Sequence, residues 1–159
     1  GCSNGERSVN GGGWVGSVSD GMRVFSFTSH TGTATDFGEL ETARSGVRAM
    51  DDGHRGVFAG GYGQPGTTHA DCNYITLMTQ GKQADFGDLP VNSRYAGATS
   101  NKTRGVVGAG TTPSHTVTTQ YLYPATLGNG VDFGNLTVAS GGVQATSSPT
   151  RGIFCGINI

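Results

Sequence analysis

The segment Asp36-Phe37-Gly38-Glu39-Leu40 recurs twice in this chain of 159 residues, as Asp85-Phe86-Gly87-Asp88-Leu89 and as Asp132-Phe133-Gly134-Asn135-Leu136. Successive copies begin 49 and 47 residues apart. Self-similarity at a fixed period of about 20–50 residues is the sequence signature of a repeat architecture. The segment therefore defines a repeat of roughly 48 residues, and we expect each copy to form the same structural unit.

A second landmark motif recurs at a fixed distance from the first. Arg55-Gly56-Val57-Phe58, Arg104-Gly105-Val106-Val107 and Arg151-Gly152-Ile153-Phe154 each begin 19 residues after an Asp of the first landmark, and a weaker copy stands at Arg7-Ser8-Val9. The distance from each Arg to the next Asp varies between 28 and 30 residues. A variable connection beside fixed spacings indicates a packed body with an adaptable loop. We expect this loop at 14–20, 61–70 and 110–117.

Each repeat contains four short segments with the alternation and the β-branched or aromatic content of strands. In the middle repeat these segments are 45–50, 55–59, 72–79 and 84–89. Gly32, Gly81 and Gly128 each stand four residues before an Asp of the first landmark, where a turn with positive φ is expected. Helical apolar spacing is not sustained anywhere without glycine, so no helix is expected.

Composition supports a folded, turn-rich, all-β chain. Glycine accounts for 29 and proline for 5 of the residues, well above their usual share of about 12%. The formal net charge is −1, and Lys82 and Lys102 are the only lysines, which argues against a nucleic-acid partner. Apolar runs of a few residues are too short to cross a membrane. Three cysteines, Cys2, Cys72 and Cys155, are too few for a disulfide framework.

Four short strands per repeat of this length are typical of a β-propeller blade. The second strand ending in Phe58-Ala59-Gly60-Gly61, the tyrosines Tyr74 and Tyr121 of the third strand, and the aromatic residue after the following turn resemble kelch repeats. This chain has the Phe of Asp-Phe-Gly where kelch repeats usually carry Trp. The whole series is more closely similar to the kelch-like repeats of bacteriophage virion proteins, particularly tail and fibre components of marine phages. The resemblance covers nearly the whole chain and implies a kelch-like β-propeller.

We expect one repeat domain over 1–159, with repeats at about 1–44, 45–93 and 94–140, and with 141–159 as the first two strands of a further blade. A closed propeller needs roughly four to eight blades. We therefore expect either two chains in a six-bladed ring, which we favour, or a piece of a longer protein. A β-trefoil is the alternative, since it also has three repeats of four strands, although the lectin-type Gln-x-Trp is absent.

Structural roles account for the recurring residues. Asp-Phe-Gly is also a kinase motif, but the Val-Ala-Ile-Lys strand and the His-Arg-Asp catalytic loop that a kinase needs beside it are absent from this sequence. We expect the Phe to fill the core of a blade, the Gly to allow the turn, and the Asp to cap it. We also expect the recurring Asp and Arg to meet in a buried or half-buried charge-assisted pair. These structural residues are Asp36, Phe37, Gly38, Arg55, Asp85, Phe86, Gly87, Arg104, Asp132, Phe133, Gly134 and Arg151.

The function expected from the sequence is binding without catalysis. No two histidines stand at the spacing of metal ligands, and the glycine run 11–13 is not followed by a helical pattern, so we expect no enzymatic activity, cofactor or metal. Trp14, Tyr62, His69 and His115 lie in the variable loops and are the candidate ligand-binding residues. We expect a structural or adhesive module of a phage virion or tail fibre, in the virion or outside the cell, which presents its loops to a partner or host surface. The alternative is a carbohydrate-binding, lectin-like propeller.

Overall fold

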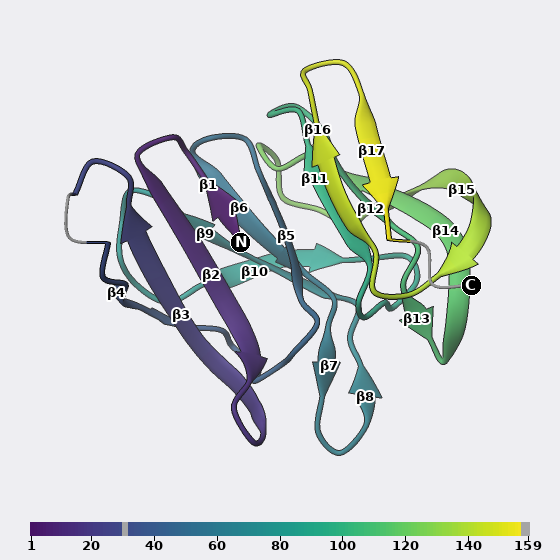
Figure 1. Ribbon diagram of the computed structural model, residues 1–159, viewed down its shortest axis with the longest axis horizontal. Helices are drawn as coiled ribbons and strands as arrows, with labels where there is room; N and C mark the ends of the chain where they lie inside the picture. The colour runs from purple at the N-terminus through teal and green to yellow at the C-terminus, as the bar shows by residue number, and fades with distance from the viewer. Residues whose placement is uncertain (30–31, 157–159) are drawn as a thin grey trace.

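The computed structural model describes residues 1–29 and 32–156. The described residues form 17 strands and no helix. Sheet 1 contains β1 (Cys2–Ser3), β2 (Arg7–Trp14), β3 (Val18–Ser26) and β4 (Thr35–Glu39), which pair antiparallel in chain order (Figure 1). Sheet 2 repeats this order with β5 (Arg48–Asp51), β6 (Arg55–Ala59), β9 (Asp71–Thr76) and β10 (Ala84–Asp88).

Sheet 3 follows the same plan with one additional short strand. It contains β11 (Gly97–Ser100), β12 (Gly105–Gly108) and β14 (Ser114–Leu122), and both β13 (Thr111–Thr112) and β15 (Val131–Ser140) pair with β14. Two hairpins complete the described part of the chain: β7 (Tyr62–Gly63) with β8 (Thr67–Thr68), and β16 (Gln144–Ser147) with β17 (Gly152–Cys155).

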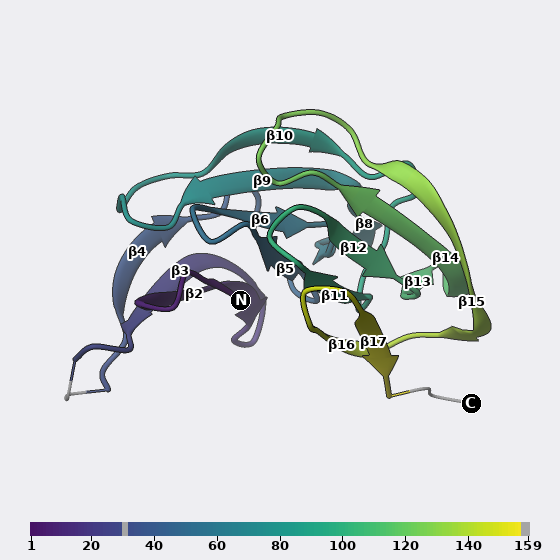
Figure 2. The same cartoon turned by 90° about the horizontal axis from the view of Figure 1, so that it is seen from above.

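The fold is all-β, and its three main sheets resemble the blades of a β-propeller. Seen from above, they follow one another along an arc that ends in the β16–β17 hairpin (Figure 2). Each main sheet is formed by strands of a single repeat. The expected fold class is confirmed, because a β-trefoil would join strands of all three repeats in one barrel.

The four strands expected in the middle repeat are present, and their bounds differ from the expected ones by at most three residues. The first strand begins at Arg48 and not at residue 45, because Ser45 forms an isolated bridge with Tyr62 of the β7–β8 hairpin. The third strand ends at Thr76, where a turn closed by the Thr79 N–H and the Thr76 carbonyl begins. The expected variable loops hold β7–β8 at 61–70 and β13 with the start of β14 at 110–117.

Apolar side chains fill the space between successive sheets. Phe37 of sheet 1 belongs to a buried cluster that also contains Phe58, Ile75 and Leu77 from sheet 2 and its following turn. Phe86 of sheet 2 belongs to a second cluster with Val107 and Leu122 of sheet 3. The expected core role therefore holds for Phe37 and Phe86, which are 1% and 2% exposed, but it is wrong for Phe133, which is 53% exposed.

The backbones of neighbouring sheets meet at the Asp-Phe-Gly segments. The Gly81 N–H donates to the Phe37 carbonyl at 3.1 Å, and the Gly128 N–H donates to the Phe86 carbonyl at 2.9 Å. A Cβ atom on Gly38 would lie 2.5 Å from the Gly81 carbonyl oxygen, so no side chain fits there. The positive φ expected of Gly32, Gly81 and Gly128 is confirmed, at 59°, 151° and 145°.

The Arg-Gly landmark has a different packing reason for its glycine. A Cβ atom on Gly56 would clash with the Cys2 sulfur of sheet 1, and one on Gly105 would clash with the Met50 sulfur of sheet 2. Both glycines are buried. Each therefore lets the first strand of one sheet pack closely on the second strand of the next sheet.

The turn between the first and second strands is capped in each repeat by a residue that the sequence reasoning did not single out. The side-chain oxygen of this residue accepts the backbone N–H of the recurring Arg, three residues later. The four pairs are Asn4 with Arg7 at 2.8 Å, Asp52 with Arg55 at 2.6 Å, Asn101 with Arg104 at 2.9 Å, and Ser148 with Arg151 at 3.2 Å. The sequence signal for these caps is a short polar residue three positions before each recurring Arg.

The expected pairing between recurring Asp and Arg is wrong. Asp36 forms an exposed ion pair with Arg23 across β4 and β3, at 2.6 Å. Arg55 instead lies over the Tyr74 ring, 4.5 Å from its centroid, and donates at 3.0 Å to the carbonyl of Pro124, just beyond β14 of sheet 3. In the part of the chain that the structure describes, no ion pair joins the Asp of one landmark to the Arg of the other. The third strand separates the two landmark strands within each sheet, and Arg55 faces sheet 3.

Candidate functional site

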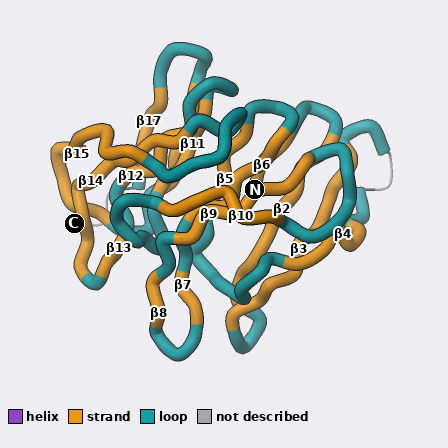
Figure 3. Tube along the Cα trace, turned by 180° about the vertical axis from the view of Figure 1, so that it is seen from behind, coloured by secondary structure: helices purple, strands orange, loops and turns teal. Residues whose placement is uncertain are grey.

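Three connections extend from the same edge of the stacked sheets (Figures 1 and 3). They are the β2–β3 turn of sheet 1, the β7–β8 hairpin that follows β6, and the β13–β14 turn of sheet 3. We call their combined surface the loop face. All four candidate ligand-binding residues lie in these connections or directly beside them, so the topology gathers them along one edge.

Trp14 is the most exposed aromatic candidate on the loop face. It ends β2, pairs with Val18, and its side chain is 57% exposed. The turn beyond it is short, with the Val15 N–H donating to the Ser17 carbonyl at 2.9 Å. The Gly13 N–H next to it donates to the Arg44 carbonyl at 2.9 Å, which ties the end of β2 to the segment that leads into sheet 2. Trp14 is therefore an exposed indole on an anchored turn.

Tyr62 is held in place at the base of the β7–β8 hairpin. Its backbone exchanges two hydrogen bonds with Ser45, at 2.9 and 2.7 Å. The guanidinium of Arg94 lies 4.8 Å from the centre of its ring, which is a cation–π contact. Arg94 was not recognised from the sequence, although it precedes Tyr95 at the position equivalent to Ser45, one repeat later.

His69 and His115 have different surroundings. His69 Nδ1 lies 2.9 Å from Asp71 Oδ2, and the other side of its ring packs against Gly63 of β7, so His69 supports the hairpin from within. His115 is exposed on β14, paired with Thr111. The structure therefore places His69 with Tyr62 in one hairpin and His115 on another connection.

Asn92 joins the two hairpins of the loop face. Its Nδ2 donates to the Thr68 carbonyl of β8 at 3.1 Å, and its Oδ1 accepts from the Thr112 hydroxyl of β13 at 2.8 Å. This exposed amide fixes the separation of the two connections. It falls outside the expected loops, and for this reason the sequence reasoning passed over it.

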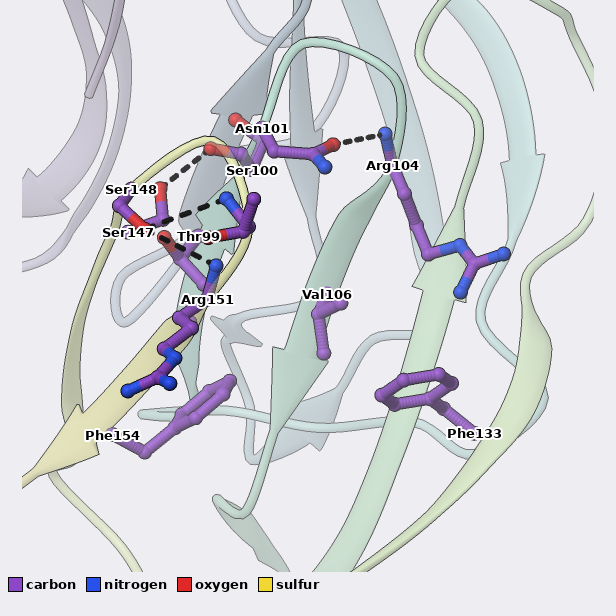
Figure 4. A pocket seen from close by; sticks show the side chains of 12 residues that line it. Thr99, Ser100, Asn101, Arg104, Val106, Phe133, Ser147, Ser148, Arg151 and Phe154 are labelled. Atoms are coloured by element: carbon purple, nitrogen blue, oxygen red, sulfur yellow. Dashed lines mark hydrogen bonds between the residues drawn. The ribbon is translucent and has the colours of Figure 1, made fainter.

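A second surface lies between sheet 3 and the β16–β17 hairpin, on the side of the β11–β12 turn. It is an open groove of about 220 Å³ that we call the hairpin groove (Figure 4). Phe133 lies on the sheet 3 side, whereas Phe154 and Arg151 come from β17 and the turn before it. Arg104 lies on the same side as Phe133, with its guanidinium 5.6 Å from the Phe133 ring centre, 4.6 Å from the Tyr121 ring centre and 3.2 Å from the Tyr123 hydroxyl.

Polar contacts fasten the β16–β17 hairpin to sheet 3. The Ser147 hydroxyl donates to the Ser100 carbonyl at 2.6 Å, and Asn101 Nδ2 donates to the Pro149 carbonyl at 3.0 Å. The Phe154 ring packs where a Cβ atom on Gly97 or Gly108 would be, which leaves no room for side chains there. The hairpin groove therefore has a well-fixed wall on both sides.

Two of the three cysteines, Cys2 and Cys72, are buried. Burial raises the pKa of the Cys2 and Cys72 thiols to about 12, so neither is a ready nucleophile. Among residues 1–29 and 32–156, no three His, Cys, Asp or Glu side chains are grouped to hold a metal ion. The same residues contain no helix with the length and hydropathy needed to cross a membrane.

Comparisons with known proteins show the fold. No protein-family model matches the sequence, and no curated protein matches it. The chain is similar to the solved structure of YjhT, a kelch-repeat β-propeller protein. The TM-score is 0.77 and the sequence identity is 11%. The similarity covers 94% of this chain and 55% of that one. This chain therefore spans about half the length of the propeller that it matches.

Proposed function

We propose that this chain is a non-enzymatic structural or adhesive binding module, a component of a phage virion or tail fibre. In this proposal the stacked sheets form a rigid body, and the loop face contacts a partner or a host surface in the virion or outside the cell. The observation that carries the proposal is the gathering of the β2–β3, β7–β8 and β13–β14 connections along one edge, anchored by Ser45, Arg94 and Asn92.

Anchored loops suit recognition because little conformational entropy is lost when they bind. Trp14 offers a large aromatic area with few rotatable bonds, and aromatic side chains dominate the energetics of many interfaces. Tyr62 pairs with Thr68 in the β7–β8 hairpin, and the Thr112 hydroxyl lies on β13 of the same face. An aromatic centre with polar neighbours is the usual composition of a protein contact surface.

A carbohydrate-binding, lectin-like function is the second candidate. The exposed indole of Trp14 favours it, because an aromatic face at 57% exposure can stack on the apolar face of a sugar ring. Neighbouring backbone and side-chain polar groups would then bind the sugar hydroxyls. This candidate uses the same loop face and differs only in the chemistry of the ligand.

We also propose that the chain associates with further blades, either of a second copy in a homodimeric six-bladed ring or of a longer parent protein. Its match to about half of a propeller supports this proposal. Light scattering at several concentrations distinguishes the two arrangements. A homodimer gives twice the monomer mass, whereas a module that needs blades of a longer parent remains monomeric.

The loop-face proposal is tested with labelled protein on bacterial cell-envelope preparations and on a glycan array. Trp14→Ala should weaken binding at least tenfold, whereas Phe27→Ala should not change it, because Phe27 is equally exposed but lies at the other end of β3. Saturable binding to a defined sugar supports the lectin, and binding that is lost after protease treatment of the envelope supports a protein partner. Equal binding by both variants contradicts a role for the loop face.

A further inference from the structure

The hairpin groove exposes a surface that is covered in both preceding repeats. Three contacts recur between sheets 1 and 2 and between sheets 2 and 3: a buried Phe, a Gly N–H donated to the carbonyl of that Phe, and an Arg donating to a carbonyl after the third strand. The Phe and Gly contacts are those of Phe37 with Gly81 and of Phe86 with Gly128.

The arginine contact follows the same pattern. Arg7 Nη1 donates to the Met78 carbonyl at 3.3 Å, and Arg55 Nη1 donates to the Pro124 carbonyl at 3.0 Å. In each case, the acceptor lies just beyond the third strand of the next sheet. The element that covers one sheet is therefore the hairpin of the third and fourth strands of the next sheet, with its connecting turn.

On sheet 3 the equivalent surface is open. Phe133 is 53% exposed, against 2% or less for its two counterparts. A Cβ atom on Gly134 would meet nothing within 4 Å, whereas one on Gly87 would lie 2.7 Å from the Gly128 carbonyl group. Arg104 already lies over Tyr121, as Arg55 lies over Tyr74. This surface therefore has the same kinds of side chain as the two covered interfaces, but among the described residues no hairpin of third and fourth strands packs over it.

The neighbouring strand edge is open as well. The β16–β17 hairpin packs on sheet 3 through Phe154, as Phe58 of β6 packs on Gly11 of sheet 1. It therefore occupies the first- and second-strand positions of a fourth sheet. Among the described residues, β17 pairs only with β16, and Ile153 on it is 59% exposed. In sheets 2 and 3 the corresponding edge, β6 or β12, pairs with the third strand.

We infer that the hairpin groove is a binding site for an antiparallel β-hairpin of the type formed by the third and fourth strands of these repeats. Its first strand pairs with β17, its apolar side chains cover Phe133, and its turn donates a glycine N–H to the Phe133 carbonyl. A carbonyl before the turn accepts from Arg104. Pairing with an edge strand supplies main-chain hydrogen bonds, and the Phe133 surface selects the side chains.

This site lies on the side of the β11–β12 turn, away from the loop face, and does not rest on the adhesive or lectin proposal (Figures 1 and 4). The occupant is defined by continuity with the two interfaces inside the chain. It must carry an apolar residue near the end of its first strand and a glycine with positive φ in its turn, as Leu122 and Gly128 do in sheet 3.

The test uses the intact chain and a peptide of its own residues 116–137, cyclised head to tail. Cyclisation reduces the entropy that a free hairpin loses on binding, and NMR of the peptide alone verifies the hairpin before titration. The chain is labelled with ¹⁵N and titrated with the peptide. We expect saturable shifts of the amides of Phe133, Gly134 and β17, with little change in the loop face.

Matched controls give the result its meaning. Phe133→Ser in the chain and Gly128→Val in the peptide should each raise the dissociation constant at least tenfold, whereas Trp14→Ala in the chain should leave it unchanged. Phe133 is exposed in the unbound chain, so its replacement should not prevent folding. Absence of saturable shifts with the verified hairpin, or equal binding by Phe133→Ser, would overturn the inference. Because Trp14→Ala affects the loop face alone, failure of the two proposals is distinguished.

Discussion

Arg44 shows how a single side chain organises the boundary between sheets 1 and 2. It is fully buried, and its Nη1 donates to the carbonyls of Gly60 and Asp71, at 3.0 and 2.9 Å, while Nη2 donates to Asn73 Oδ1. Burial lowers the pKa of its guanidinium. The equivalent positions in the next repeats are Ser93 and Ser140, both buried. Arg44 thus stands where the next two repeats have a serine, and its side chain donates to three acceptors.

Replacing Arg44 should cost much more stability than replacing an exposed arginine. Arg44→Ala removes the donor to two buried acceptors, the Gly60 carbonyl and Asn73 Oδ1, and leaves a cavity at a fully buried position, so we expect a loss of about 3 kcal/mol or more. Arg23→Ala, which breaks only the exposed ion pair with Asp36, should cost about 1 kcal/mol or less. Urea unfolding of both variants measures the difference. Similar midpoints for the two variants would show that Arg44 is not a structural residue.

The three cysteines should differ sharply in reactivity. Cys2 and Cys72 are buried with a pKa raised to about 12, whereas Cys155 is exposed. Iodoacetamide at pH 8 should therefore add one group to the native chain, at Cys155, and three groups in urea, as measured by intact mass. The raised pKa values also predict that stability falls as the pH rises from 9 towards 12, because unfolding then permits ionisation. Fast native modification of Cys2 would contradict the buried position.

The pairing expected between the recurring Asp and Arg failed because of where their strands lie in the sheets. The constant spacing of 19 residues from Asp to Arg reflects a fixed length of chain from the fourth strand of one sheet to the second strand of the next, and it carries no information about contact. Within a sheet the third strand lies between their strands, so Arg55 meets Tyr74 and Asp36 meets Arg23. The aromatic partner could have been predicted from the register of the second and third strands, since Val57 pairs with Tyr74.

At the scale of elements, the close approach of successive sheets should make two equivalent glycines unequal. Gly87 and Gly134 have nearly the same positive φ, 132° and 129°, so an alanine is strained by the backbone to the same extent at both. Only at Gly87 does the added Cβ meet the next sheet. Gly87→Ala should therefore be less stable than Gly134→Ala by about 1–3 kcal/mol, as expected of overpacking.

Thermal unfolding of the two alanine variants measures this difference. Because Gly134→Ala carries the same backbone strain, it is the matched control for the contact. Equal melting temperatures would mean that the sheets do not approach each other as closely as the Gly128 contact requires.

The strands were largely predictable from the sequence, because each repeat independently marks the same turns with glycine and Asp. β6 has the expected bounds, and β9 and β10 differ from them by a few residues. The additional strands β7, β8 and β13 were not predictable, since Thr67–Thr68 and Thr111–Thr112 are too short to show an alternating pattern. The exposed position of Phe133 was also not predictable from the sequence, because its motif is the same as in the two buried copies.

At the scale of the whole molecule, stability comes from sheets that stack on their neighbours rather than from one central core. Two apolar clusters lie between successive sheets. The repeat count predicted this architecture, but not the loop face or the hairpin groove, since both depend on which connections and side chains the stacking leaves exposed.

The stacking of the sheets is tested most directly by hydrogen exchange of the Gly81 and Gly128 amides, followed by NMR. Both residues lie in exposed turns, and the bonds that their N–H groups make cross to Phe37 and Phe86 of the preceding sheets. We predict exchange slowed at least about a hundredfold relative to an unstructured chain, which corresponds to opening free energies near 3 kcal/mol. Exchange of both amides at the rate of an exposed turn would contradict the stacked-sheet structure.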